Sequence, residues 1–330
     1  AGGGAVHCLG GCAALVCTVY LKPRIGIFNA DGTRTRAGAN PVLVLLGCFL
    51  LWVGWFAFNG GSAGGLSHGR HYVAALAAIN TAVASGMGTL TAMCFTYLNV
   101  GASPDGRTRG FDMFETITGL LAALVGITPS AGFVEPWAAL IIGFLAAITG
   151  ALVSKAIERL MVDDPVDAFA VHGAAGVVGL VLTGVFADAR VGQPEGYEPI
   201  AQGMIYGGGM RLVGVQALGA TVILVWSTLM TTLFLFVAGR FVPIRTSKID
   251  ELTGANSGLD LMIACPETIR AEIAVHLEDV ADSTSINLPE HLRKRKVKPN
   301  KLHGGGGHSH SGGGHHGGGH HGHSHGGGGG

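Results

Sequence analysis

The sequence predicts an all-α membrane protein, a bundle of membrane-spanning helices that contains an inverted five-helix repeat. Three observations favour this class. Asp, Glu, Lys and Arg make up only 13% of the 330 residues, about half of the roughly 25% that soluble domains carry. Seven apolar segments each approach the ~20 residues that a helix needs to cross a bilayer. Two of these segments share one histidine-bearing motif, although they are expected to run in opposite directions.

The seven apolar segments follow one another closely along the chain. We expect spans at residues 1–20, 41–60, 72–98, 111–129, 137–159, 167–187 and 211–241. Of the 56 glycines, 16 follow His303, which leaves 40 before it, and small residues at this density let membrane helices approach closely. The sequence therefore predicts three parts: a transmembrane domain over 1–241, a cytoplasmic regulatory tail over 242–302 and a disordered His/Gly-rich tail over 303–330.

The loops between the predicted spans alternate in basic charge. Loops 21–40 and 99–110 and the segment after span seven carry Lys22, Arg24, Arg34, Arg36, Arg107, Arg109, Arg240, Arg245 and Lys248. The loops between them carry only Arg70 and Arg190, and the loop 160–166 does not discriminate. Because Lys and Arg are retained on the cytoplasmic side, we expect span one to run from outside to inside. The same rule predicts a cytoplasmic C-terminus.

The first and sixth spans have similar amino-acid sequences. Residues 5–16 read AVHCLGGCAALV and residues 170–181 read AVHGAAGVVGLV, with six of twelve positions identical. Five spans separate the two segments, so they cross the membrane in opposite directions, as an inverted-topology repeat requires. Spans two to six would then form one complete repeat, and span one would be the last helix of the other. We therefore expect four further helices before Ala1.

The shared motif makes His7 and His172 the candidate functional residues. An ionisable ring in hydrocarbon costs about 2–3 kcal/mol or more unless it faces protein or a wet cavity. In inverted-repeat transporters the working site lies near the midplane, at the interface between the repeats, where these two rings would meet. Two neutral imidazoles present one donor and one acceptor to each other. That arrangement suits a small hydrogen-bonding solute or a proton, whereas either ring alone also fits a buried structural histidine.

Several segments resemble the ammonium transporter (Amt/Mep/Rh) family, and the Amt branch in particular. DDPVDAFAVHGAAGVVGLVLTGVFA (163–187) is similar to the family's tenth helix, AGGGAVHCLGGCAALV (1–16) to its fifth, LLWVGWFAFNGGSAG (50–64) to its sixth, GITPSAGFVEP (126–136) to the end of its eighth and YGGGMRLVGVQALG (206–219) to the start of its eleventh. The resemblance covers about residues 1–260. It implies an eleven-helix fold of which this chain matches helices five to eleven, a homotrimer in the plasma membrane, and no enzymatic activity or cofactor.

The resemblance also implies roles for residues in these motifs. His7 and His172 match the twin histidines of the family's pore. Asp167 matches the acidic residue that heads the tenth helix, where a carboxylate stabilises a helix N-terminus, so its role is structural or proton-related. Asn59 falls within the sixth-helix motif, and we interpret it as structural.

Three further residues match the family's outer ammonium-binding site: Trp55, Phe58 and Ser62. Their chemistry agrees with that role, because an aromatic face attracts a cation by about 0.5–2 kcal/mol and a serine hydroxyl accepts an N–H hydrogen bond. Without the resemblance, Trp55 and Phe58 would be interpreted as an aromatic belt at the membrane interface.

The resulting hypothesis is a channel that captures ammonium, removes a proton and conducts ammonia past the twin histidines. One alternative is an ammonium sensor that signals to a regulatory protein through its cytoplasmic tail, because RTSKIDELTGANSGLDLM (245–262) resembles the family's regulatory tail with a longer spacing. A metal-ion transporter is the third reading, prompted by the nine of fifteen histidines from His303 onward. We nevertheless predict no metal site, since intramembrane acidic clusters are lacking. The net charge of zero gives no support to nucleic-acid binding.

Overall fold

The computed structural model describes residues 1–34, 40–98, 111–191, 200–246 and 251, and no strand occurs among them. Two π-helical segments lead into α-helices: η1 (Gly3–Cys8) into α1 (Leu9–Leu21), and η3 (Phe169–Ala174) into α6 (Ala175–Phe186). The other elements are α2 (Pro41–Gly61), α3 (Arg70–Leu98), α4 (Met113–Ile127), α5 (Pro136–Arg159), the 3-10 turn η4 (Met204–Tyr206) and α7 (Arg211–Ala238). The predicted all-α class is confirmed. The two predicted tails, 242–302 and 303–330, lie almost wholly outside the described residues.

In the part of the chain that the structure describes, six helical runs are apolar and long enough to cross a membrane, so the chain is a multi-pass membrane protein. The predicted fourth span, 111–129, is wrong in length. Helix α4 has 15 residues, about 22 Å at 1.5 Å per residue, which is short of the ~30 Å hydrocarbon core. It begins late because the Asp112 carboxylate caps it by accepting the backbone N–H of Glu115. It ends at Ile127, because Pro129 has no backbone N–H with which to continue the helical hydrogen bonds.

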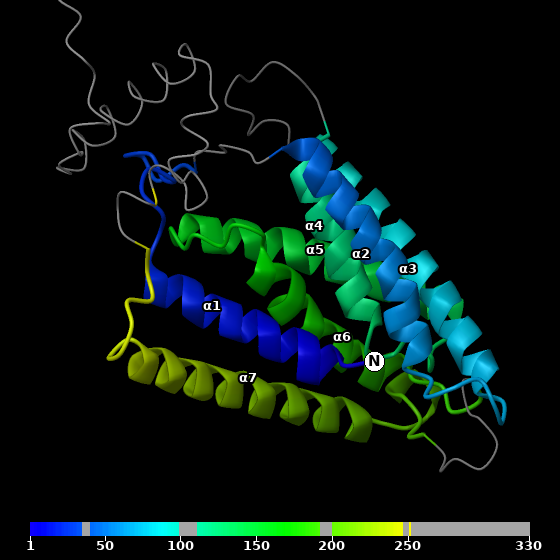
Figure 1. The fold of residues 1–330 in the computed structure, drawn as a ribbon. Coiled ribbons are helices and arrows are strands. Elements are labelled where there is room, and N and C mark those ends of the chain that lie inside the picture. The colour runs from blue at the N-terminus through cyan, green and yellow to red at the C-terminus, as the bar shows by residue number, and fades with distance from the viewer. Residues whose placement is uncertain (35–39, 99–110, 192–199, 247–250, 252–330) are drawn as a thin grey trace, which may run out of the picture.

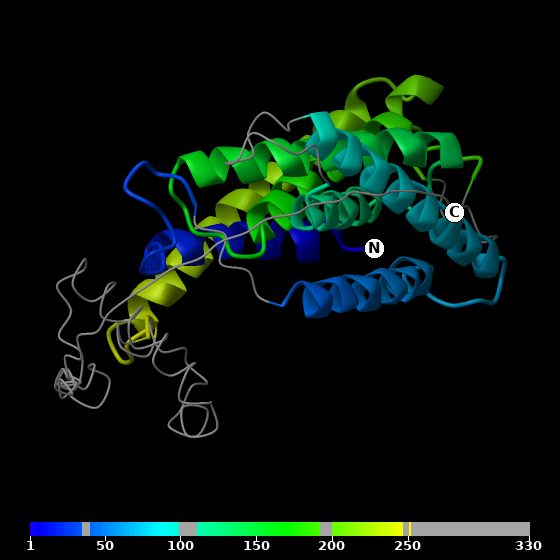
Figure 2. The ribbon, with the colours of Figure 1, turned by 90° about the horizontal axis from the view of Figure 1, so that it is seen from above.

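The helices pack in two groups that share α6 (Figure 1). Helices α3, α4 and α5 pack closely against one another, and α7 lies along α1. Glycines allow the close approach: a Cβ on Gly143 would meet the backbone of Ala84, and one on Gly126 would overlap the Ala146 side chain. Helix α2 packs mainly against α3 and stands at one side of the bundle (Figure 2).

The two histidine-bearing segments cross each other through reciprocal contacts. A Cβ on Gly11 would overlap the backbone of Gly173, and a Cβ on Gly176 would come within 2.9 Å of the Cys8 sulfur. Gly11 aligns with Gly176, and Cys8 aligns with Gly173, in the repeated motif. Each motif therefore uses the same two positions to contact the other, which is what two copies related by a pseudo-two-fold axis do. No bulkier side chain than glycine fits at Gly11.

Ion pairs at one end of the bundle show which loops lie together. The Arg24 guanidinium donates to Asp163 over 2.7 Å, and Arg34 donates to the same carboxylate over 3.3 Å. Burial raises the pKa of the Asp163 carboxyl, but hydrogen bonds from Arg24 and the charges of both arginines outweigh it and hold that pKa below its usual range. Arg245, after α7, pairs with Glu251 over 2.9 Å. It also donates to the backbone carbonyls of Leu21 and Pro23, just before Arg24. Since α1 ends where η3 begins, the two histidine segments run in opposite directions.

A second polar cluster joins the loops at the opposite end. The Asp188 carboxylate is fully buried and accepts hydrogen bonds from the Arg190 guanidinium. The Arg190 Nε lies 2.9 and 3.1 Å from its two oxygens, and Nη2 lies 2.7 Å from one of them. The same guanidinium lies 5.0 Å from the ring centroid of Tyr206, whose hydroxyl donates to Glu135 over 2.9 Å. These contacts tie the α4–α5, α6–α7 and η4 segments together at the end where α2 also finishes.

Candidate functional site

The two predicted histidines meet at the crossing of their helices. The Nδ1 atoms of His7 and His172 are 3.2 Å apart, and the ring planes are inclined by only 15°. With both rings neutral, one nitrogen donates and the other accepts, and an exchange of tautomers reverses the direction of the bond. The pair can therefore hold or pass a single proton along its shared edge.

Both rings are presented by a π-helical turn. His7 lies in Gly3–Cys8 and His172 lies in Phe169–Ala174, and each segment continues as an ordinary α-helix. π-turns occur frequently at functional sites, because they shift side chains out of the regular helical register. His7 is only 6% exposed, and its Nε2 atom has no hydrogen-bond partner among the described residues. The ring thus offers one free polar atom inside an apolar wall.

Helix α2 contributes two aromatic side chains that cover His7. The Trp55 ring lies parallel to the imidazole, with centroids 5.1 Å apart and planes inclined by 10°. Phe58 is tilted against His7 at 5.6 Å and against Trp55 at 5.9 Å. The buried Trp55 indole donates to the hydroxyl of Thr128 over 2.9 Å, which holds the ring in place. The predicted site residues Trp55 and Phe58 are therefore in contact with His7, on one side of the histidine pair.

The predicted residues become more exposed toward the end of α2. Trp55 is 7% exposed and Phe58 is 39% exposed, and Ser62, one turn later at the C-cap of α2, is exposed as well. The Ser62 hydroxyl donates to the carbonyl of Phe58 over 2.7 Å. Since its proton is used there, its oxygen is left to accept a hydrogen bond from another molecule. The order from the surface inward is Ser62, Phe58, and then the His7 ring under Trp55.

Asp167 lies away from this line of residues. Its carboxylate accepts the hydroxyls of Thr118 from α4 and Ser154 from α5, both over 2.8 Å. Its backbone is left-handed, with φ of 53°. The helix N-terminus is capped instead by Asp164, whose carboxylate accepts the backbone N–H of Phe169 over 2.9 Å. Among the described residues the Asp167 side chain thus bonds to α4 and α5 rather than to the helix terminus, and its two hydroxyl partners favour the structural one of its two expected roles.

Thr128 is the contact that sequence reasoning missed. Its hydroxyl donates to the carbonyl of Leu124 over 2.7 Å and accepts the indole N–H of Trp55, and it is completely buried. The segment that contains it was recognised by resemblance, but neither periodicity nor spacing links Thr128 to Trp55, 73 positions away. Within the described residues, no group of three or more His, Cys, Asp or Glu side chains could hold a metal ion. The His-rich tail lies outside those residues.

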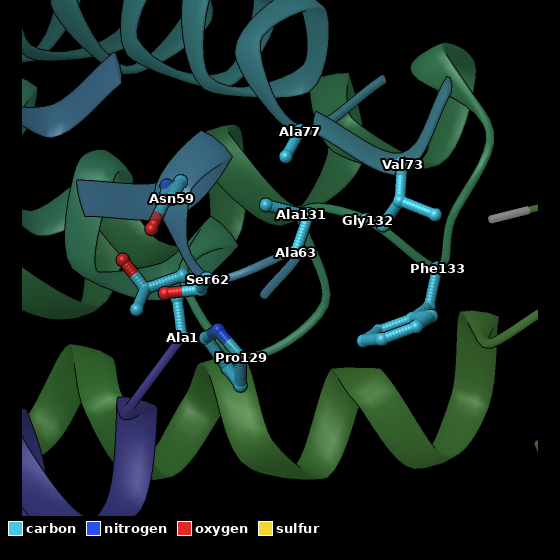
Figure 3. A pocket seen from close by; sticks show the side chains of 11 residues that line it. Ala1, Asn59, Ser62, Ala63, Val73, Ala77, Pro129, Ala131, Gly132 and Phe133 are labelled. Carbon is cyan, nitrogen blue, oxygen red and sulfur yellow. The ribbon is translucent and has the colours of Figure 1, made fainter. Parts of the chain in front are cut away.

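A small hollow opens beside these residues at the end of α2 (Figure 3). Asn59 and Ser62 of α2, Val73 and Ala77 of α3, and Thr128 and its successors in the α4–α5 connection line it. The space in it that a water-sized molecule can occupy is about 20 Å³. A cavity needs roughly 10–15 Å³ on this measure to hold one water molecule, so the hollow suits a solute of that size.

Comparisons with known proteins agree with this arrangement. Residues 1–259 match the Ammonium Transporter Family. The chain is 33% identical over 278 residues to ammonium transporter Amt2 of Archaeoglobus fulgidus, covering 84% of this chain and 57% of that protein. It is 36% identical over 267 residues to ammonium transporter 1 member 4 of Arabidopsis thaliana, covering 78% of this chain and 52% of that protein.

Solved structures give the same result. The crystal structure of Candida albicans Mep2 matches with a TM-score of 0.68 and 29% identity, covering 81% of this chain and 58% of that one. A structure described as a sensor Amt protein matches with a TM-score of 0.67 and 33% identity, covering 77% and 58%. The chain thus spans little more than half the length of these four proteins. The matching motifs, the helical arrangement and the family match over residues 1–259 all agree. This chain therefore belongs to the ammonium transporter family.

Proposed function

We propose that this chain forms a path for ammonium across the membrane and recruits the ion at Trp55, Phe58 and Ser62. The exposed Phe58 ring offers a cation an attractive face. The Ser62 oxygen is free to accept an N–H bond because its own proton is donated to Phe58. Both groups lie on the surface side of His7, so a captured ion would already be aligned with the histidine pair.

The ion then gives up a proton and continues as neutral ammonia. An uncompensated charge costs far more than a neutral amine in a low-dielectric interior, and His7 lies in such an interior at 6% exposure. The unpartnered Nε2 of His7 can exchange hydrogen bonds with ammonia as it passes. The 3.2 Å contact between the two rings supports a second role, relaying the released proton. Potassium carries the same single positive charge but has no proton to lose, so the path rejects it.

The observation that carries this proposal is the His7–His172 contact beneath an aromatic cover. Its test is uptake of labelled methylammonium by the protein as encoded in full, expressed in cells that lack ammonium transporters. His172→Ala should lower uptake about tenfold or more, since losing one hydrogen-bonding group in a buried path costs on the order of 1.4 kcal/mol. Val6→Ala is the control, because Val6 adjoins His7 but is 50% exposed. Unchanged uptake and unchanged exclusion of potassium in His172→Ala would contradict the proposal.

The same proposal extends to the setting of the protein. Helices α2 and α7 are the least buried of the long apolar helices, at 11% and 17%, which supports contact with lipid or with other helices. We place the protein in the plasma membrane as a homotrimer, with the end that carries Arg24, Arg34 and Arg245 in the cytoplasm. We also propose that the chain divides at residues 241 and 302, with the membrane domain first and both tails in the cytoplasm. Accessibility of engineered cysteines on each side would test the orientation.

An ammonium sensor is the second candidate. Arg245 donates to Glu251 and to the carbonyls of Leu21 and Pro23, so the segment after α7 is tied to the loop that follows the His7 helix. One similar structure is described as a sensor Amt protein. Ammonium occupancy could then be transmitted to a regulatory protein at the cytoplasmic face. Deleting residues 263–330 distinguishes the two: retained uptake with lost signalling favours the sensor.

A further inference from the structure

The hollow at the end of α2 contains a buried polar atom that has no hydrogen-bond partner among the described residues. Asn59 is 2% exposed, and its side-chain oxygen accepts no hydrogen bond from that part of the chain. A buried amide oxygen in this state is rare and calls for a ligand or a bound solvent molecule. In Figure 3 this oxygen points toward the side of the hollow where Ser62 lies.

The direction of the Asn59 amide follows from its neighbour. The amide nitrogen lies 2.9 Å from the hydroxyl oxygen of Thr81. That hydroxyl donates its only proton to the carbonyl of Ala77 over 2.6 Å, so it can only accept from Asn59. The NH₂ group must therefore face Thr81 and the oxygen must face the hollow. The reversed amide would place two acceptors against each other.

The other hydroxyls around the hollow are also left as acceptors. Ser62 donates to the Phe58 carbonyl, and Thr128 donates to the Leu124 carbonyl. The remaining side chains on the wall are apolar, among them Val73, Ala77 and Phe133. The polar side chains that line the hollow thus present oxygen lone pairs to it, and Ala1 also lines it. Ammonium has only protons to donate, so it can bond to several of these oxygens at once.

We propose that this hollow is a second ammonium site, in which Asn59 accepts an N–H bond from the ion after it leaves Ser62. The proposal rests on the proposed function and adds Asn59 to it as a binding residue. Asn59 binds through the oxygen that Thr81 orients. The hollow then discriminates by geometry as well as charge, since a few directed lone pairs match N–H bonds better than they replace the full hydration shell of potassium.

The test measures the KM and maximal rate of ammonium uptake for Asn59→Leu and Asn59→Asp in the protein as encoded in full. Leucine removes the acceptor at nearly constant size, so KM should rise about tenfold or more, as losing a hydrogen bond to a charged group predicts. Aspartate keeps an acceptor toward the hollow, although the Thr81 hydroxyl must turn its proton from Ala77 to the second carboxylate oxygen, so its KM should lie nearer the wild-type value than that of Asn59→Leu. Ser85→Ala is the matched control, because it also loses a buried hydrogen bond, from Trp52, but lies outside the hollow.

Each outcome decides something. If the wild type takes up no ammonium, the proposed function fails; if it does, and Asn59→Leu keeps the wild-type KM, only this inference fails. A parallel fall in maximal rate for Asn59→Leu, Asn59→Asp and Ser85→Ala, with KM unchanged, would mean that Asn59 is structural or holds water only. Should Asn59→Leu not fold, Ala63→Val fills the hollow from a half-buried position. It should raise KM in the same direction, and an unchanged KM there would overturn the proposal.

Discussion

The two histidine-bearing helices carry the same motif but sit in different surroundings. Of the residues in the apolar window of Phe169–Phe186, 50% are buried, against 28% for Gly3–Leu21. The His172 segment is held at its start by two carboxylates, from Asp164 and Asp167, which bond to its backbone and to the neighbouring helices. The His7 segment has no such anchor among the described residues. It is held by the crossing itself and by the rings of α2.

Within the described residues, the two rings are therefore positioned in different ways. The His172 helix has α4 and α5 packed behind it. Its ring can therefore be positioned by a rigid frame. The His7 ring is positioned mainly by groups that would also meet the solute, Trp55 and Phe58. Mutations in the frame should consequently act on stability, and mutations around His7 should act on binding and rate.

The largest effect should come from the crossing that joins the two helices. A methyl group at Gly11 would overlap the backbone of Gly173, while the neighbouring Gly10 has open space around its Cβ position. Gly11→Ala should cost about 3 kcal/mol or more, because a backbone atom cannot move aside as a side chain does. Gly10→Ala should be neutral or stabilise by about 0.5–1 kcal/mol, since alanine favours the helix. Thermal unfolding in detergent measures both.

Gly176→Ala sharpens the same experiment. Its added methyl would meet the Cys8 sulfur at 2.9 Å, a side-chain atom that can shift by a few tenths of an ångström. Its nearest backbone atom is 3.3 Å away, whereas a methyl group at Gly11 would overlap backbone directly. We expect a loss of about 1 kcal/mol, at the low end of what overpacking costs. Equal effects of Gly11→Ala and Gly176→Ala would contradict the contact difference that separates the two helices.

The next effect concerns Asp167, the anchor that only the His172 helix possesses. Its left-handed backbone is tolerated by asparagine, so Asp167→Asn removes the charge without adding strain. It should cost about 1 kcal/mol, because Thr118 and Ser154 donate to different carboxylate oxygens and the single asparagine oxygen can accept from only one of them. Asp167→Ala should cost about 2–3 kcal/mol, since both hydroxyls lose their acceptor and alanine resists this backbone.

Ammonium uptake by the Asp167→Asn protein separates the two roles that the sequence left open. A structural carboxylate predicts a lower unfolding temperature with uptake per folded molecule maintained. If the folded variant conducts poorly at every pH, Asp167 takes part in proton movement, and the frame described above also belongs to the pathway.

The fold was predictable where a single property of the amino-acid sequence determined it. Apolar length located the helices, except α4, where the capping residue Asp112 and Pro129 shortened the run. The repeated motif predicted the meeting of His7 and His172, because the same six letters occurred in helices of opposite direction. Periodicity did not predict the π-turns, since both motifs continue the apolar pattern of an ordinary helix.

The candidate site was predictable only in part, because its polar contacts join distant segments. The bond between Trp55 and Thr128 spans 73 positions, and that between Thr118 and Asp167 spans 49. No local pattern encodes such pairs. Asn59 illustrates the limit: its place in the motif led to a structural interpretation, and only the directions of the surrounding hydroxyl protons distinguish its oxygen as a free acceptor.

The smallest effect should come from the aromatic side chains that cover His7. Changes there should alter ammonium binding and leave stability unchanged. Phe58→Leu removes an exposed ring face, worth about two- to fivefold in cation affinity at such a site, while leucine keeps the apolar contact with Trp55. The apparent affinity for ammonium should fall by that factor with the unfolding temperature unchanged. Phe49→Leu is the matched control, because Phe49 is 49% exposed on the same helix and stacks on Trp52 rather than on His7. If both variants weaken affinity equally, the ring over His7 contributes nothing specific. A change in Phe58→Leu alone would identify the His7 side as the one that binds, as the unequal surroundings of the two histidines require.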